Sequence, residues 1–132
     1  MTKNLRPLPL GISEFSQLRE SGAIYVDKTD VICSNARIPG NMIYIARPRG
    51  FGKTLLLSTY ESLFSRGSAD LRGLKGVGIW KLRRVHRIVR LDFDSLCGSP
   101  DAESFEARFD SSIVDTFSRQ GFKLVAVSYT HL

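Results

Sequence analysis

The residues best suited to chemistry form one short stretch, Arg47-Pro48-Arg49-Gly50-Phe51-Gly52-Lys53-Thr54. An apolar run over 42–46 precedes it, and a run with the apolar spacing of a helix follows it over 55–64. Strand, glycine-bearing loop, Lys-Thr and helix is the order in which a phosphate-binding P-loop is built. The pattern G-x-x-x-x-G-K-[ST] lacks only its first glycine, because Arg47 stands there.

A loop of this kind binds phosphate through main-chain N–H groups and the positive end of the following helix. Pro48 holds residue 47 in an extended conformation, which Arg47 can adopt, so the missing glycine is tolerable. Lys53 would reach the β- and γ-phosphates, and the hydroxyl of Thr54 would bind Mg²⁺. The sequence therefore predicts an ATP and magnesium site, against the plainer alternative of an ordinary strand-to-helix turn. Its predicted nucleotide-binding residues are Arg49, Gly50, Phe51, Gly52, Lys53, Thr54 and Leu55.

Three further motifs occur in a fixed order with this loop: Leu8–Phe15, Tyr25–Thr29 and Arg90–Asp94. Together the four stretches resemble the AAA-ATPase-like domain that opens a group of bacterial predicted ATPases, over about Leu8–Phe117. One departure is Gly50, where that family usually has a second arginine. The resemblance implies nucleotide binding in the bacterial cytoplasm, and a PD-(D/E)XK nuclease-like domain usually follows such a domain.

The predicted fold is α/β, a P-loop NTPase-type parallel sheet with flanking helices, truncated at its C-terminal side. Strands at 42–46 and 86–92 would be neighbours or near-neighbours, joined by the helix that starts at Thr54. We expect an extended N-terminal arm over 1–12 and a partial AAA-ATPase-like domain over 13–126. Residues 127–132 resemble a translated sequencing adapter, which predicts a non-native tail.

Other elements follow from capping residues and apolar spacing. We expect a helix from Ser13 to about Glu20, a short strand over 23–26, a helix from Lys28 to about Asn35, and a long helix from about Asp101 to about Arg119. Asp27-Lys28-Thr29 has two open interpretations. It is a helix cap with a solvated face, or it has a functional role that the sequence does not specify.

Asp92 is a weak candidate for the catalytic acid and for a second magnesium ligand, because it ends an apolar run. The alternative is that it only ends a strand. The resemblance implies that the family's Walker B acids come after the helix that ends near Arg119, and no apolar run followed by Asp-Glu occurs up to Val125. We therefore expect nucleotide binding without ATP turnover by this chain.

The net charge of +6 is concentrated in the middle of the chain. Residues 47–90 hold eleven Lys or Arg against Glu61 and Asp70, which suits a polyanionic partner. An alternative function is therefore a nucleic-acid-binding module that uses the basic run Lys81–Arg90, although such a run is also typical of a solvated surface. A third is a P-loop-fold interaction domain.

Composition excludes several other classes of protein. No apolar run is long enough to span a membrane, and the N-terminus has no secretion signal, so we expect a cytoplasmic location. Cys33 and Cys97 lack metal-like spacing, which predicts reduced thiols. His86 and His131 have no partner at the spacing of a zinc site or a catalytic triad.

Overall fold

The computed structural model describes residues 5–40, 42–81 and 85–123. The chain divides into two compact units, Met1–His86 and Arg87–Leu132. The first contains helices α1 (Phe15–Glu20), α2 (Thr29–Ala36) and α3 (Lys53–Arg66) and the 3-10 helices η1 (Ala69–Leu71) and η2 (Lys75–Gly78). The second contains the 3-10 helix η3 (Asp94–Leu96) and helix α4 (Ala102–Arg119). The predicted tail at 127–132 lies outside the described residues.

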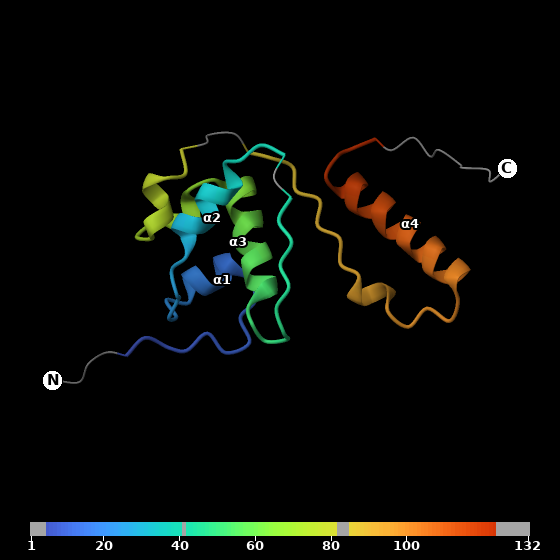
Figure 1. Ribbon diagram of the computed structural model, residues 1–132, viewed down its shortest axis with the longest axis horizontal. Coiled ribbons are helices and arrows are strands. Elements are labelled where there is room, and N and C mark those ends of the chain that lie inside the picture. Colours follow the sequence, from blue (N-terminus) through green and yellow to red (C-terminus); the bar gives the residue numbers. More distant parts are fainter. Residues whose placement is uncertain (1–4, 41, 82–84, 124–132) are drawn as a thin grey trace. The chain divides into compact units, whose positions relative to one another are not determined.

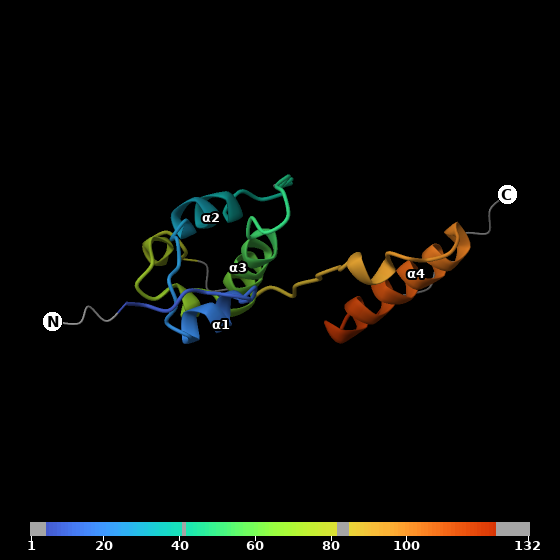
Figure 2. The same cartoon turned by 90° about the horizontal axis from the view of Figure 1, so that it is seen from below.

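Helix α3 is the centre of the first unit, with α1 and α2 packed beside it (Figure 1). The buried core is formed by Phe15, Ile32, Cys33, Leu63, Leu71 and Trp80. These residues come from all three α-helices and from the turns that follow α3. Figure 2 shows the same unit from below, with the 3-10 helix η2 next to α2, whereas η1 contacts α3 and α1. Apolar burial between helices therefore holds the described part of this unit together.

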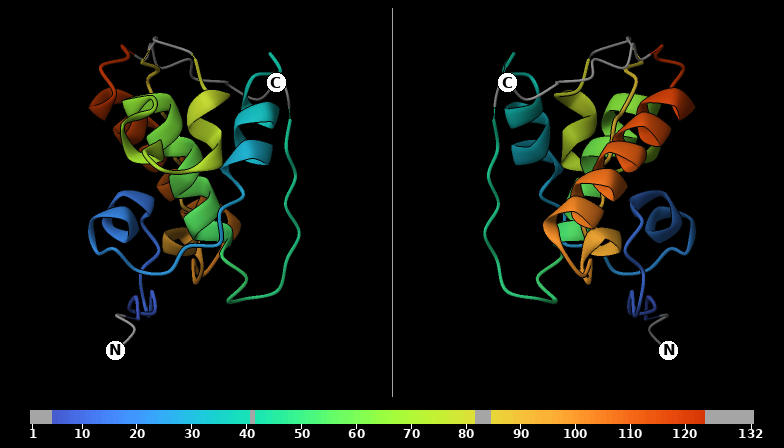
Figure 3. Two further views of the ribbon diagram at one scale, coloured as in Figure 1. Left: turned by 90° about the vertical axis from the view of Figure 1, so that its left-hand side faces the viewer. Right: turned by 90° about the vertical axis from the view of Figure 1, so that its right-hand side faces the viewer.

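The predicted parallel sheet is wrong. Within the described residues the structure has helices and extended segments but no strand. Residues 42–46 are extended and run alongside α3 (Figures 1 and 3), yet the side chains of Met42 and Tyr44 are 93% and 91% exposed. The N–H of His86, at the start of the second predicted strand, donates instead to the Phe64 carbonyl at 2.8 Å.

The physical reason is that a strand exists only through pairing with another strand. A β-favouring sequence gives an extended backbone, and residues 42–46 have one. Nothing in that local pattern supplies a partner for their N–H and C=O groups. The short strand predicted at 23–26 fails in the same way, since Ile24 N–H makes one bond, to the Pro7 carbonyl at 2.9 Å, and no ladder follows.

The predicted helices are confirmed to within a few residues. Helix α3 begins one residue before the expected Thr54 and ends at Arg66, followed by Gly67 with φ 67°. Helix α4 is capped by the Asp101 side chain, which accepts a hydrogen bond from Ser104 N–H at 2.7 Å. In the second unit, the ring of Phe93, the residue directly before η3, stacks on the ring of Phe109 in α4, with the ring centres 5.7 Å apart.

Candidate functional site

The loop before α3 has the backbone shape that its glycines predict. Gly50 and Gly52 have φ values of 78° and 71°, in the left-handed region that residues with a side chain rarely adopt. A Cβ on either would meet no atom within 4 Å, so backbone conformation and not crowding requires glycine here. Gly52 is the residue directly before α3 and turns the chain into the helix.

The N-terminus of α3 has no internal cap. Gly52 has no side chain to accept a hydrogen bond, and no acidic residue lies in the first turn. The first main-chain bond at this end runs from Leu56 N–H to the Gly52 carbonyl at 2.9 Å. Among the described residues no acceptor pairs with the N–H groups of Lys53, Thr54 and Leu55. These groups and the helix dipole leave a positive end open to an anion.

The Lys53 side chain folds back over the loop. Its Nζ donates to the carbonyl of Arg47 at 2.7 Å and to the carbonyl of Pro48 at 2.8 Å. These bonds hold an ammonium group, which has three donors, beside the free end of the helix. A positive charge near a helix N-terminus is repelled by the positive end of the helix dipole, which costs about 0.3–1 kcal/mol. A bound anion would reverse that penalty.

Thr54 follows with an exposed side chain in the first turn of the same helix. The other magnesium candidate, Asp92, lies in the second unit, where its Oδ1 accepts a hydrogen bond from Asp94 N–H at 3.0 Å. The role of Asp92 as a magnesium ligand therefore stays a prediction. Among the described residues, no group of three His, Cys, Asp or Glu side chains is arranged to hold a metal ion.

The Leu8–Phe15 motif is hydrogen-bonded to helix α3 through Ser58. The Ser58 hydroxyl accepts a hydrogen bond from Phe15 N–H at 2.8 Å and donates to the Glu14 carboxylate at 2.7 Å. Ser58 is 4% exposed and lies one turn after Thr54. The start of α1 is therefore fixed to the same helix that carries the loop, which gives that motif a positioning role.

The Tyr25–Thr29 motif forms a second fixed point, which we call the clamp (Asp27, Thr29, Lys75 and Gly76). Asp27 Oδ1 accepts hydrogen bonds from the Thr29 N–H at 2.9 Å and the Thr29 hydroxyl at 2.6 Å. Its Oδ2 accepts from Lys75 N–H at 2.8 Å, and Thr29 Oγ1 accepts from Gly76 N–H at 2.9 Å. The sequence allowed a cap or a function for this motif, and the structure shows that Asp27 bonds both to Thr29, the first residue of α2, and to η2.

The clamp is characterised by a lowered pKa at Asp27 and by close packing at Gly76. Burial by itself raises the pKa of the Asp27 carboxyl, but the hydrogen bonds from Thr29 and Lys75 outweigh it, and the pKa lies below its ordinary value. A Cβ on Gly76 would lie 2.7 Å from Cys33 Sγ and 2.9 Å from the Thr29 carbonyl oxygen. Only glycine lets η2 approach α2 this closely.

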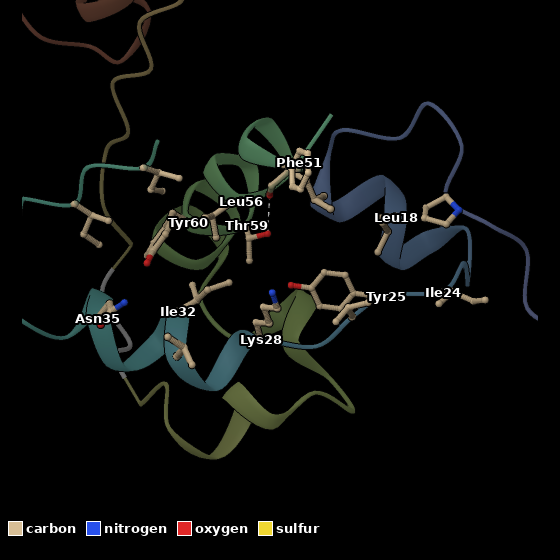
Figure 4. A pocket seen from close by; sticks show the side chains of 17 residues that line it. Leu18, Ile24, Tyr25, Lys28, Ile32, Asn35, Phe51, Leu56, Thr59 and Tyr60 are labelled. Atoms are coloured by element: carbon tan, nitrogen blue, oxygen red, sulfur yellow. Dashed lines mark hydrogen bonds between the residues drawn. The ribbon is translucent and has the colours of Figure 1, made fainter. Parts of the chain in front are cut away.

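A cavity of about 600 Å³ adjoins the loop. Phe51, Gly52 and Leu55 line it on the loop side, and residues of α1, of α2, of the following turns of α3 and of the extended segments line the rest (Figure 4). Most of its surface is apolar. Its polar groups are the hydroxyls of Tyr25, Thr59 and Tyr60, the amide of Asn35 and the ammonium of Lys28. Sequence reasoning missed this cavity, because it depends on how α2 and α3 pack.

The two tyrosine hydroxyls already have partners in the cavity wall. Tyr25 bonds with Thr59, and Tyr60 bonds with Asn35. Burial, the larger effect, raises the pKa of both tyrosines, although these bonds oppose it. Both hydroxyls therefore stay protonated and available only as neutral hydrogen-bonding groups.

The basic run Lys81–Arg90 is only partly described, since Arg83 and Arg84 lie outside the described residues. Arg87 donates to the Gly121 carbonyl at 3.3 Å and stacks over the Phe122 ring at 5.1 Å. Arg90 also has an interaction partner. Cys33 is a buried free thiol and Cys97 an exposed one.

The model of a family described as "Predicted AAA-ATPase" matches residues 9–126. The chain belongs to this predicted AAA-ATPase family. A relative from Azotobacter chroococcum mcd 1, an "Uncharacterized protein in vnfD 5'region", is 36% identical over 89 residues. That alignment covers 67% of this chain and 17% of the relative, so the chain spans under a fifth of the relative's length. No solved structure matches the chain.

Membership of the predicted AAA-ATPase family agrees with the resemblance seen in the four sequence motifs. The matched range contains the loop, the clamp and the cavity. No helix among the described residues is long and apolar enough to cross a membrane.

Proposed function

We propose that the chain binds ATP with Mg²⁺, with the phosphates at Arg49–Leu55. The observation that carries this proposal is the uncapped start of α3. Its first three N–H groups have no acceptor among the described residues, and Lys53 is held beside them by two carbonyls. A polyphosphate supplies acceptors for the N–H groups and negative charge for the ammonium and the dipole.

A nucleotide fits this arrangement better than phosphate alone. Phe51 and Gly52 belong both to the loop and to the lining of the cavity. A ligand whose phosphates lie on the loop can therefore extend into the cavity. Its volume of about 600 Å³ lies in the range of small-molecule sites, and its lining is mainly apolar and aromatic. In this proposal Thr54 binds the magnesium ion through its hydroxyl, and the nucleoside enters the cavity.

The family description supports nucleotide binding, and we expect no ATP turnover by this chain. Turnover needs an acid that holds the magnesium or its waters and a group that orients the attacking water. Asp92, the weak candidate for that acid, belongs to the other unit. The proposal is therefore one of binding, in the reduced environment that the two free thiols favour.

The test is calorimetric titration of the wild-type chain and Lys53→Ala with Mg²⁺ and ATP. We expect the substitution to weaken binding at least about tenfold, or about 1.4 kcal/mol. Lys81→Ala is the matched control, since Lys81 is exposed and does not line the cavity. Equal affinity of wild type and Lys53→Ala would contradict the proposal.

A further inference from the structure

Lys28 lies between the two residues whose side chains form the clamp. Asp27 and Thr29 fix the backbone on either side of it, through the Lys75 and Gly76 N–H groups and through each other. The Lys28 side chain itself lines the cavity (Figure 4). Within the described residues its ammonium group has no hydrogen-bond or ion-pair partner. A fixed backbone therefore presents an unpaired cation at a largely apolar cavity.

An ammonium group in this position limits what can fill the cavity. Water satisfies it while the cavity is open, because Lys28 is exposed. A ligand that displaces this water must replace the lost hydrogen bonds, or binding is penalised. Because an ammonium group only donates, the ligand must offer an acceptor at this point. Tyr25, Phe51 and Tyr60 provide aromatic faces in the same cavity, so a planar ring with acceptor nitrogen or oxygen atoms suits it.

We propose that Lys28 is a nucleoside-reading residue, which donates a hydrogen bond to an acceptor on the purine base of the bound nucleotide. This inference rests on the proposed function, because the phosphates must lie at Arg49–Leu55 for the base to enter the cavity. In this proposal Lys53 binds the phosphates of the nucleotide and Lys28 binds its base. Lys53, the first residue of α3, bonds to the loop carbonyls and is not among the residues that line the cavity, whereas Lys28 lines the cavity from the start of α2.

The experiment compares two ligands, Mg²⁺ with ATP and Mg²⁺ with inorganic tripolyphosphate, by calorimetry on the full chain. Lys28→Met removes the charge and the donors while keeping much of the side-chain length. We expect it to weaken ATP about tenfold and to leave tripolyphosphate within about twofold of wild type. Lys81→Met is the matched control, and we expect it to change neither ligand. Lys28→Arg keeps a donor and should restore part of the ATP affinity.

The outcomes separate this inference from the proposed function. Lys53→Ala should weaken both ligands, since it removes the phosphate contact; if it changes neither, the proposed function fails and this inference fails with it. If Lys53→Ala weakens both ligands but Lys28→Met weakens neither, only the nucleoside role of Lys28 is overturned. Equal losses for ATP and tripolyphosphate in Lys28→Met would also overturn it, because Lys28 would then act on the phosphates.

Because the Lys28 side chain is exposed and makes no hydrogen bond or ion pair among the described residues, the variant should keep its fold. We expect Lys28→Met and Lys81→Met to unfold at the same temperature as each other. A loss of ATP affinity accompanied by a lower unfolding temperature in Lys28→Met alone would count against a binding role, since disruption of the clamp would explain it.

Discussion

The loop at 50–55 and the clamp between α2 and η2 use similar residues in opposite ways. Each has a glycine, a threonine and a lysine close together, and each lies at the start of a helix. In the clamp the N–H groups of Thr29, Lys75 and Gly76 all reach side-chain acceptors. In the loop the N–H groups at the start of α3 reach none among the described residues. The two regions therefore differ in whether their main-chain N–H groups already have hydrogen-bond acceptors, and not in residue type. N–H groups with acceptors form a structural contact, and N–H groups without them can bind a ligand.

The largest expected effect is a loss of ATP affinity when Gly52, which has a positive φ, is replaced. Gly52→Val forces a β-branched residue into a left-handed conformation, on the backbone that passes the proposed phosphates. We expect it to abolish ATP binding, by at least about 100-fold or about 2.7 kcal/mol, while helical content by circular dichroism stays near wild type. Gly22→Val places the same strain at φ 65°, away from the loop, and should keep its affinity. A crystal of Gly52→Val with nucleotide on the loop would end this interpretation.

At the clamp the expected change is in stability. A Cβ on Gly76 would strike Cys33 Sγ and the Thr29 backbone, so Gly76→Ala should lower the free energy of unfolding by about 2–3 kcal/mol. Gly78→Ala is the control, because a Cβ there meets nothing within 4 Å. Urea unfolding of the two variants measures the difference. Equal stabilities would show that α2 and η2 do not pack as described.

Replacing threonine by valine in each region distinguishes a role in stability, expected in the clamp, from a role in binding, expected at the loop. Thr29→Val removes the buried hydroxyl that accepts from Gly76 N–H, so we expect a loss of about 1–2 kcal/mol of stability. Thr54→Val removes an exposed hydroxyl and should leave stability unchanged. Thr54→Val should instead reduce the magnesium dependence of ATP binding. Reversed results, with Thr54→Val the less stable variant, would refute the contrast between the two regions.

The smallest expected effect is the pH dependence of the clamp. Because the pKa of Asp27 is lowered from 3.8 in the folded state, the unfolded chain binds the proton first as pH falls. The stabilisation is fully present above pH 3.8 and is lost as pH falls through the lower folded value. Urea midpoints measured from about pH 5 down to about pH 3 should therefore fall less steeply in Asp27→Asn than in wild type. Parallel curves would mean that Asp27 contributes no ionised contact.

The parts predictable from sequence were those set by local interactions. The ends of α3 and α4 follow from Gly52, Gly67 and Asp101, whose conformations or hydrogen bonds involve residues at most a few positions away. The loop residues were likewise readable as a pattern. Their role as a nucleotide site stays a prediction, now supported by the free start of α3.

The parts that sequence could not predict depend on contacts between distant residues. The clamp joins Asp27 to a residue 48 positions later, and no local signal marks Lys75 or Gly76 as its partner. The cavity and the place of Lys28 in its wall depend on the same packing. The sheet was predicted wrongly for the same reason, since the extended tendency of 42–46 is local but pairing is not.

The most direct test of the account follows individual amides by nuclear magnetic resonance while Mg²⁺ and ATP are added. The account predicts that the largest shifts occur at the N–H groups of Lys53, Thr54 and Leu55, which gain phosphate acceptors. The N–H groups of Lys75 and Gly76, already paired in the clamp, should shift little. Unchanged amides at 53–55 in a sample saturated with ATP, or shifts concentrated at 75–76, would contradict the claim that the free start of α3 binds phosphate.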